Sequence, residues 1–167
     1  CLLLPLDLSD TGALSPFIER VLAHYGRIDA LINNASSFYP TPIGAATAAH
    51  WDELFAANAK APFFLAQAAA PHLAKTGGCI LNMVDIYGER PLALHPLYSM
   101  AKAALAMMTM ALARDLGPAV RVNGIAPGAV LWPETGKAEG ERRDLLARTP
   151  LVRAGEPADI ARTALFL

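Results

Sequence analysis

Residues Cys79–Lys102 read CILNMVDIYGERPLALHPLYSMAK, an apolar run followed by a polar and proline-containing loop and the start of an alanine-rich segment. The first residues of this stretch form a short, nearly continuous apolar run, which predicts a buried strand over Cys79–Val84. Its last residues open a segment rich in Ala, Met and Leu, which predicts a helix over Tyr98–Leu116. A strand, a loop and a helix in this order form the repeating unit of a parallel α/β sheet.

The same alternation extends along the whole chain. Strands are also predicted at Cys1–Pro5, Ile28–Ile32 and Val120–Ile125, and helices at Leu14–Tyr25, Thr47–Lys75 (kinked near Asn58–Pro62), Glu141–Arg148 and Pro157–Leu167. Because the strands are continuous apolar runs, we expect both faces of the sheet to be buried. The pattern therefore predicts an α/β fold in which a parallel sheet is covered by helices on both faces.

Length and composition limit the class of protein. The chain has 167 residues, enough for one domain, and 54% of them are hydrophobic, which is ample for a core. The net charge of −1 comes without a basic run, and no apolar stretch reaches the roughly 20 residues that cross a bilayer. We therefore expect no nucleic-acid or membrane partner. Two cysteines form no disulfide framework, which favours a cytoplasmic location.

Candidate functional residues lie at or just beyond the ends of all four predicted strands. Asp7 follows the first, Asn33–Phe38 the second, Asp85 the third and Pro127-Gly128 the fourth. The carboxyl ends of parallel strands meet at one edge of a sheet, and ligands bind there. The sequence therefore predicts a functional site at this edge.

Tyr98 and Lys102 are the first candidates for chemistry at that site. They are four residues apart, so on a helix they share one face about one turn from each other. An ammonium beside a phenol favours the phenolate, so we expect Lys102 to lower the pKa of Tyr98. This predicts Tyr98 as a proton donor to a substrate that is being reduced.

Together with Asp85, thirteen residues before Tyr98, these residues resemble the active site of the short-chain dehydrogenase/reductase family. In that family Tyr-x-x-x-Lys follows a serine by the same interval, and here an aspartate takes the place of that serine. Asn33-Asn34-Ala35 likewise resembles the family motif Asn-Asn-Ala-Gly, with Ser36 in place of the glycine. The resemblance covers nearly the whole chain and implies a single Rossmann-like, doubly wound dinucleotide-binding domain over residues 1–167. Because the family's glycine-rich phosphate-binding turn is not in this sequence, we expect the domain to be truncated at its N-terminus and also at its C-terminus.

The resemblance also implies roles for other residues. Asn58 joins Asp85, Tyr98 and Lys102 in the catalytic set, with a structural and proton-relay role. The implied cofactor-binding residues are Asp7, Leu8, Asn34, Ala35, Tyr98, Lys102, Pro127 and Gly128. Plainer interpretations stay open for two of these residues: Asn58 could fill a gap in the helix before Pro62, and Asp7 could be an acid near a helix N-terminus.

The run from Asn33 to Pro42 resembles the pteridine reductase branch of the family more narrowly. In that branch the residues matching Ser36 and Phe38 line the pterin site. A planar heteroaromatic ring can be sandwiched between an aromatic side chain and the nicotinamide. The implied substrate-binding residues are Ser36, Phe38, Asp85, Tyr98 and, as a cover from the long loop after Pro127-Gly128, Trp132. Trp132 could equally serve as the hydrophobic anchor of its own loop.

Aspartate suits the reduction of a C=N bond, because the nitrogen must gain a proton. Beside a ketone, a carboxylate would instead oppose the negative charge that builds on oxygen. The resemblance therefore implies NADPH-dependent reduction of pterins, dihydropterins or dihydrofolate. Two alternatives remain: a reductase of ketones of the acyl-chain or sugar type, and a non-enzymatic member of the fold that senses a cofactor.

The remaining features concern metals and assembly. The four histidines show no metal-ligand spacing with one another, so no metal site is predicted. One of them, His95, lies three residues before Tyr98 and could approach the substrate, but we interpret it as a loop residue. The helix Tyr98–Leu116 has apolar residues on more than one face, which predicts burial against both the sheet and a partner subunit. By resemblance, the assembly would be a homotetramer.

Overall fold

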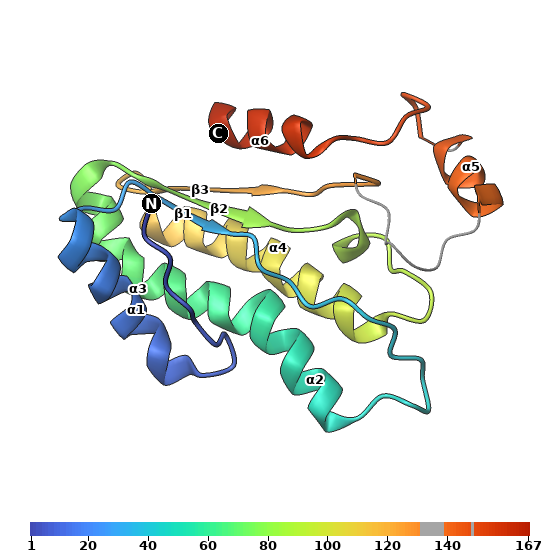
Figure 1. Ribbon diagram of the computed structural model, residues 1–167, viewed down its shortest axis with the longest axis horizontal. Coiled ribbons are helices and arrows are strands. Elements are labelled where there is room, and N and C mark those ends of the chain that lie inside the picture. The colour runs from blue at the N-terminus through green and yellow to red at the C-terminus, as the bar shows by residue number, and fades with distance from the viewer. Residues whose placement is uncertain (131–138, 148) are drawn as a thin grey trace. The chain divides into compact units, whose positions relative to one another are not determined.

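The computed structural model describes residues 1–130, 139–147 and 149–167 (Figure 1). Its contacts divide the chain into two compact units, Cys1–Ala126 and Pro127–Leu167. The first unit contains α1 (Thr11–Tyr25), β1 (Ala30–Asn33), α2 (Ala48–Phe55), the π-helical turn η1 (Ala56–Lys60), α3 (Ala61–Thr76), β2 (Cys79–Met83), the 3-10 turn η2 (Ile86–Gly88), α4 (Pro96–Leu116) and β3 (Arg121–Ile125). The second unit contains α5 (Glu139–Ala147) and α6 (Pro157–Phe166).

The three strands form a parallel sheet in the order β1-β2-β3. The register places Ala30 opposite Cys79 and Cys79 opposite Arg121, so the carboxyl ends of the strands are level. In Figure 1, α3 and α4 lie on the same side of this sheet, where α3 contacts β1 and α4 contacts β3. The predicted Rossmann-like α/β fold, a parallel sheet flanked by helices, is confirmed.

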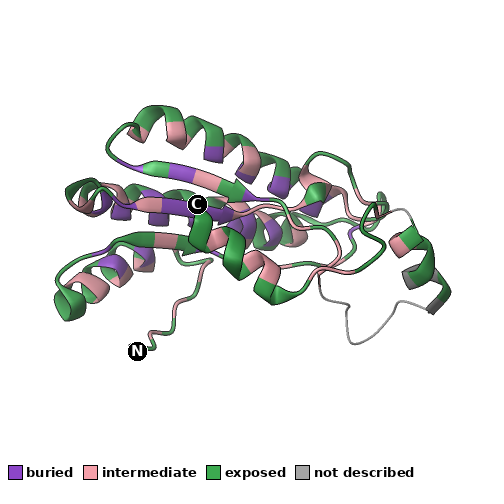
Figure 2. Cartoon of the chain, turned by 90° about the horizontal axis from the view of Figure 1, so that it is seen from above, coloured by how far each residue is buried: buried purple, intermediate pink, exposed green. Residues whose placement is uncertain are grey.

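The core of the first unit lies between the sheet, α1 and α3. Buried leucine, isoleucine and valine side chains meet there: Leu14, Ile18, Leu65, Leu73, Ile80 and Val122. Figure 2 shows buried residues along the strands and on one side of the helices beside them. Removing such side chains from water contributes roughly 1.5–3 kcal/mol each.

Local signals explain the helix boundaries. The Asp10 side chain accepts a hydrogen bond from the Gly12 backbone N–H, so α1 begins at Thr11, three residues earlier than predicted. Gly26 ends α1 in the left-handed conformation, at φ 74°. The kink predicted near Asn58–Pro62 is the π-helical turn η1 between α2 and α3.

The prediction of a buried strand over Cys1–Pro5 is wrong. The segment is extended but belongs to no strand, and the side chain of Leu3 is 87% exposed. Its backbone is anchored by Leu2, whose N–H donates to the Tyr25 hydroxyl at 2.9 Å. An apolar run becomes a strand only when a neighbouring strand pairs with its backbone, and the described sheet consists of β1, β2 and β3.

None of the helices in the described ranges is long and apolar enough to span a membrane.

Candidate active site

Asp85 and Tyr98 meet just beyond the carboxyl end of β2. Asp85 caps η2, because its Oδ1 accepts a hydrogen bond from the Tyr87 backbone N–H at 2.9 Å. Tyr98 lies in the first turn of α4 and is only 4% exposed. Its hydroxyl donates to Asp85 Oδ2 at 2.7 Å. The contact places these two side chains at the edge of the sheet where the sequence predicts a site.

Gly88 allows this contact, because η2 approaches the backbone of α4 closely. A Cβ atom at Gly88 would lie 3.0 Å from the carbonyl carbon of Lys102 and 3.1 Å from its oxygen. A side chain there would push η2 away from α4. Glycine therefore keeps the Asp85 turn against the helix that carries Tyr98.

Lys102 is buried beside the pair, with 2% of its surface exposed. Its Nζ donates to the Met83 carbonyl oxygen at 2.8 Å and lies 5.7 Å from the centroid of the Tyr98 ring. Burial lowers the pKa of Lys102, and the nearby Asp85 carboxylate partly opposes this shift. The ammonium group is thus aimed at the end of β2.

The pKa of Tyr98 is raised above its ordinary value of 10. Burial is the largest cause and the hydrogen bond to Asp85 the second, while a hydrogen bond with Ser36 acts in the opposite direction. The prediction that Lys102 lowers the pKa of Tyr98 is therefore wrong for this structure. The Lys102 donor is directed to Met83, and the carboxylate disfavours the phenolate. Tyr98 is held as a neutral phenol, which is the form that a proton donor needs.

Asn58 ties η1 to the loop after β1. Its Nδ2 donates to the carbonyl oxygens of Leu54 and Ser37, both at 2.9 Å, and its Oδ1 accepts from Ser36 Oγ at 2.7 Å. The bond to Leu54, one turn earlier, confirms the plainer interpretation of an amide that satisfies the helix backbone. The bonds to Ser36 and Ser37 also fix the loop that approaches Tyr98.

Phe38 stands at the exposed side of the site. Half of its surface is exposed, and its ring meets Tyr98 edge-on, with the centroids 4.8 Å apart and the planes at 81°. The geometry places an accessible aromatic ring directly beside the phenol. Such a pair can hold a flat ring next to a proton donor.

The residues assigned to the cofactor are in several different environments. Asn34 and Ala35 are exposed directly after β1, whereas Leu8 packs against the core. Asp7 accepts hydrogen bonds from Ser9 N at 2.8 Å and Ser9 Oγ at 2.7 Å, which lowers its pKa. These bonds to Ser9, just before α1, support the plainer interpretation of Asp7 as an acid near a helix N-terminus.

Three further predictions fall outside this unit. Pro127 and Gly128 belong to the second unit, Pro127–Leu167. Trp132 lies outside the described residues.

Two further side chains, those of Tyr87 and His95, lie beside these residues. Tyr87 packs with Leu54, Leu97 and Tyr98, and the turn Asp85-Ile86-Tyr87 was its available signal. His95 was interpreted as a loop residue, and its ring stacks on that of Phe38. No local sequence pattern indicates the stacking of His95 on Phe38.

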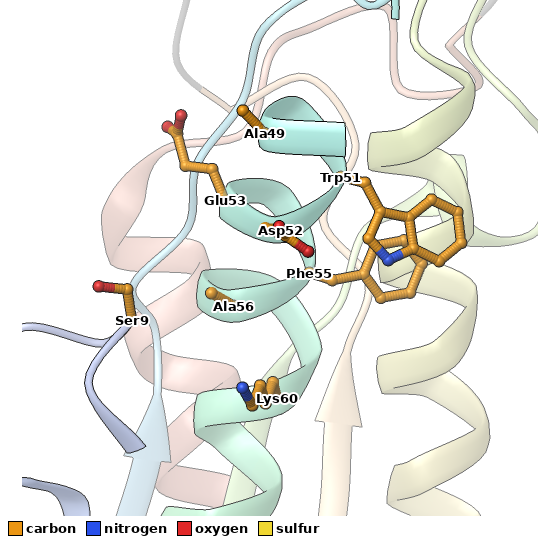
Figure 3. Close-up of a pocket in the computed structure, with 8 residues that line it drawn as sticks. All are labelled: Ser9, Ala49, Trp51, Asp52, Glu53, Phe55, Ala56 and Lys60. Atoms are coloured by element: carbon orange, nitrogen blue, oxygen red, sulfur yellow. The ribbon is translucent and has the colours of Figure 1, made fainter. Parts of the chain in front are cut away.

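A separate pocket lies along α2 and η1 (Figure 3). Its lining residues are Ser9, Ala49, Trp51, Asp52, Glu53, Phe55, Ala56 and Lys60. In Figure 3, Trp51 and Phe55 point to one side of α2 and Glu53 to the other, and the two aromatic rings stack 4.3 Å apart. None of the residues assigned to catalysis, cofactor or substrate lines this pocket.

Known proteins resemble this chain along nearly its whole length. The family model described as enoyl-(acyl carrier protein) reductase matches residues 1–167. The 3-oxoacyl-(acyl-carrier-protein) reductase of Thermotoga maritima is 33% identical over 165 residues, which cover 97% of this chain and 67% of that protein. Pteridine reductase 1 of Leishmania tarentolae is 33% identical over 176 residues, which cover 92% of this chain and 61% of that protein.

A solved structure shows the same likeness in three dimensions. A 7α-hydroxysteroid dehydrogenase, in complex with NADH and 7-oxo glycochenodeoxycholic acid, matches with a TM-score of 0.90 and 33% identity, over 96% of this chain and 64% of that chain. The chain thus spans about two thirds of the length of the relatives that it matches. It belongs to the short-chain dehydrogenase/reductase family, a family of NAD(P)-binding oxidoreductases.

Proposed function

We propose that the native protein reduces C=N bonds of pterins, dihydropterins or dihydrofolate, with NADPH as the hydride donor. The observation that carries the proposal is the Asp85 carboxylate, 2.7 Å from the Tyr98 hydroxyl, at the position where the family has a serine. The exposed ring of Phe38 beside Tyr98 supports a flat heteroaromatic substrate. Similarity to a pteridine reductase along 92% of the chain supports the same branch.

The residues at this edge of the sheet fit a dinucleotide. The Lys102 ammonium has three donors, of which one is directed to Met83, so it can also bind the hydroxyls of a ribose. Asn34 and Ala35 are exposed directly after β1, where the nicotinamide half would lie against them. When bound, the cofactor supplies the hydride. The choice of NADPH over NADH rests on the resemblance to pteridine reductases.

The proton chemistry belongs to the chain itself. A reduced C=N bond needs a proton on its nitrogen, and the raised pKa of Tyr98 keeps a proton on its hydroxyl at neutral pH. The Asp85 carboxylate lies within one hydrogen bond of that hydroxyl, and after it takes up a proton from solvent it provides a second group able to transfer a proton. In the proposal, the two residues serve successive reductions of one heterocycle. Asn58 holds the Ser36 loop beside them and takes part in proton relay.

Reduction of a ketone is the second candidate function. It is favoured by the 33% identity to a 3-oxoacyl-(acyl-carrier-protein) reductase and by the description of the matching family model. The Asp85 carboxylate argues against it, because negative charge would develop on the substrate oxygen beside it. A purely cofactor-sensing role has less support, since such a protein would not need Tyr98 as a proton donor.

We also propose that residues 1–167 form one dinucleotide-binding domain of a cytoplasmic homotetramer. The match of the family model over the whole chain supports one domain, and the free thiols of Cys1 and Cys79 favour a reducing compartment. Assembly is supported by apolar side chains on the outer face of α4, where Met107 is 62% and Met110 is 59% exposed.

Steady-state kinetics with the full-length native protein test the substrate class. With NADPH, we expect turnover of dihydrobiopterin or dihydrofolate to exceed turnover of a β-keto ester. The Asp85→Ser variant should lose about 100-fold in kcat/KM for the dihydropterin, because one proton source is removed, while its Kd for NADPH stays unchanged.

Asp115→Ser provides the matched control, because Asp115 is exposed near the end of α4. Unchanged dihydropterin turnover by Asp85→Ser would contradict the assignment. A wild-type preference for the β-keto ester would establish the ketone reductase instead.

A further inference from the structure

Two loops from distant parts of the chain meet beside Tyr98. Phe38 lies in the loop after β1, and His95 directly precedes α4. Their rings are stacked, with centroids 4.8 Å apart and planes within 11° of parallel. Because Phe38 also meets Tyr98 edge-on at 4.8 Å, one ring contacts both the histidine and the phenol.

The His95 ring is itself held in a fixed orientation. Its Nδ1 lies 2.8 Å from the Ala93 carbonyl oxygen. A carbonyl only accepts, so the hydrogen bond assigns the proton to Nδ1. This bond restricts rotation of the imidazole about its own side-chain torsions.

The backbone around His95 is also fixed to the Phe38 loop. Leu94 has a φ of 64°, in the left-handed region that leucine rarely adopts. Its carbonyl oxygen accepts a hydrogen bond from the Thr41 N–H at 2.7 Å, and the nearby Leu92 N–H donates to Ser99 Oγ at 3.2 Å. Surrounding contacts therefore maintain an unfavourable conformation just where His95 is presented to Phe38.

Stacking on His95 has a direct consequence for substrate binding. A half-exposed phenylalanine on a loop would otherwise sample several rotamers. With His95 stacked on Phe38, the ring is held in one place while half of its surface stays exposed to a second flat ring. We propose that His95 is a positioning residue, which fixes Phe38 so that its exposed surface receives a planar heteroaromatic substrate. This inference rests on the proposed pterin reduction and concerns recognition of the ring.

The test compares His95→Ala with wild type in steady-state kinetics of the full-length native protein. With dihydrobiopterin and saturating NADPH, we expect KM to rise about five-fold, the order expected for one lost aromatic contact, while kcat stays within about two-fold. The proton donors Asp85 and Tyr98 are untouched, which is why kcat is preserved. The His95→Phe variant keeps a flat ring and should restore KM to within about two-fold of wild type. His24→Ala, at the exposed end of α1, is the matched control.

A double variant shows whether His95 acts through Phe38. If it does, Phe38→Leu combined with His95→Ala should have the same KM as Phe38→Leu alone. If the fold increases in KM of the two single variants multiply in the double variant, the proposal is overturned, because His95 would then act on the substrate independently of Phe38. If His95→Ala lowers the melting temperature severely, His95→Leu fills the space without a ring and should show the same rise in KM.

The outcomes separate this inference from the proposed function. Wild-type pterin turnover with an unchanged KM in His95→Ala would overturn this inference alone. An equal loss of activity on pterin and β-keto ester would also overturn it, since a general structural defect would explain that result. A wild-type protein without pterin turnover would overturn both.

Discussion

Two hydrogen-bonded networks join the sheet to α4, and they use different kinds of side chain. In the interior network, Asn33 Nδ2 donates to Asn82 Oδ1 at 2.8 Å, and Asn82 Nδ2 donates to Thr109 Oγ1 at 2.9 Å. Thr109 Oγ1 in turn donates to the Leu105 carbonyl oxygen at 2.8 Å. All three side chains are buried, and none of them ionises at ordinary pH.

The second network, formed by Asp85, Tyr98 and Lys102, consists of ionisable groups. Burial and the Asp85 carboxylate raise the pKa of Tyr98, while burial lowers the pKa of Lys102. Phe38 gives this network an exposed aromatic neighbour, whereas the interior network is enclosed by the sheet and α4.

In the proposed function, α4 therefore carries groups for stability and groups for chemistry at different points along its length. Lys102 and Thr109 are seven residues apart, about two helical turns. The interior network satisfies its buried polar groups and so stabilises the fold. The second network places groups that gain and lose protons at the carboxyl edge of the sheet. Substitutions in the two networks should therefore have different consequences.

The largest expected effect is on turnover, from Tyr98→Phe. The variant keeps the ring and its contact with Phe38 but loses the hydroxyl that holds the transferable proton. We expect kcat/KM for the preferred substrate to fall about 1,000-fold, within the range typical of lost acid catalysis. Thermal unfolding should show a melting temperature close to that of wild type.

Tyr25→Phe is the matched control for this comparison, because Tyr25 lies at the end of α1 and its hydroxyl accepts from Leu2. It should leave kcat/KM unchanged. Retained turnover in Tyr98→Phe would show that the network around Asp85 is not the source of the proton.

The complementary substitution, Asn82→Ala, should lower the free energy of unfolding and leave kcat/KM nearly unchanged. It removes both hydrogen bonds of the interior network and leaves the Asn33 amide and the Thr109 hydroxyl buried without that partner. We expect the free energy of unfolding to fall by about 3 kcal/mol in urea denaturation. At a temperature where the variant stays folded, kcat/KM should remain within about three-fold of wild type.

Asn123→Ala, on the neighbouring strand β3, provides the control for removing an asparagine side chain from the sheet. It should cost clearly less stability than Asn82→Ala. An Asn82→Ala protein with wild-type stability and reduced kcat would reverse the roles that we assign to the two networks.

The parts of the fold and of the candidate site that depend on residues close together in the chain could be predicted from the sequence. Tyr98 and Lys102 share a helix, and Asp85 lies just after a predicted strand, so spacing and apolar pattern were enough to place all three near the same edge of the sheet. The strand predicted at Cys1–Pro5 failed because strand formation depends on a paired neighbour, which composition does not reveal.

The details of the site depend on contacts between distant segments. The direction of the Tyr98 pKa shift follows from Lys102 donating to the Met83 carbonyl, whose position is set by packing of β2 against α4. The stack of His95 on Phe38 joins loops that are far apart in the chain. Neither relation leaves a local pattern in the sequence.

The smallest expected effect is a difference in the pH dependence of stability. The pKa of Tyr98 is raised in the folded protein above its ordinary value of 10, so the unfolded chain releases this proton first as pH rises. The contribution of Tyr98 to stability is therefore fully present below pH 10 and is lost as pH rises above it. Lys102 has a lowered pKa and acts in the opposite direction, but it is present in both wild type and Tyr98→Phe.

Urea denaturation at pH 8, 10 and 11 measures this difference. Between pH 10 and 11, the free energy of unfolding of wild type should fall more steeply than that of Tyr98→Phe, by up to about 1.4 kcal/mol per pH unit. Asn82→Ala should lower stability by the same amount at all three pH values, because its network contains no group that titrates there. Parallel curves for wild type and Tyr98→Phe would show that the Tyr98 phenol is not held protonated by Asp85 and burial, which removes the electrostatic distinction between the two networks.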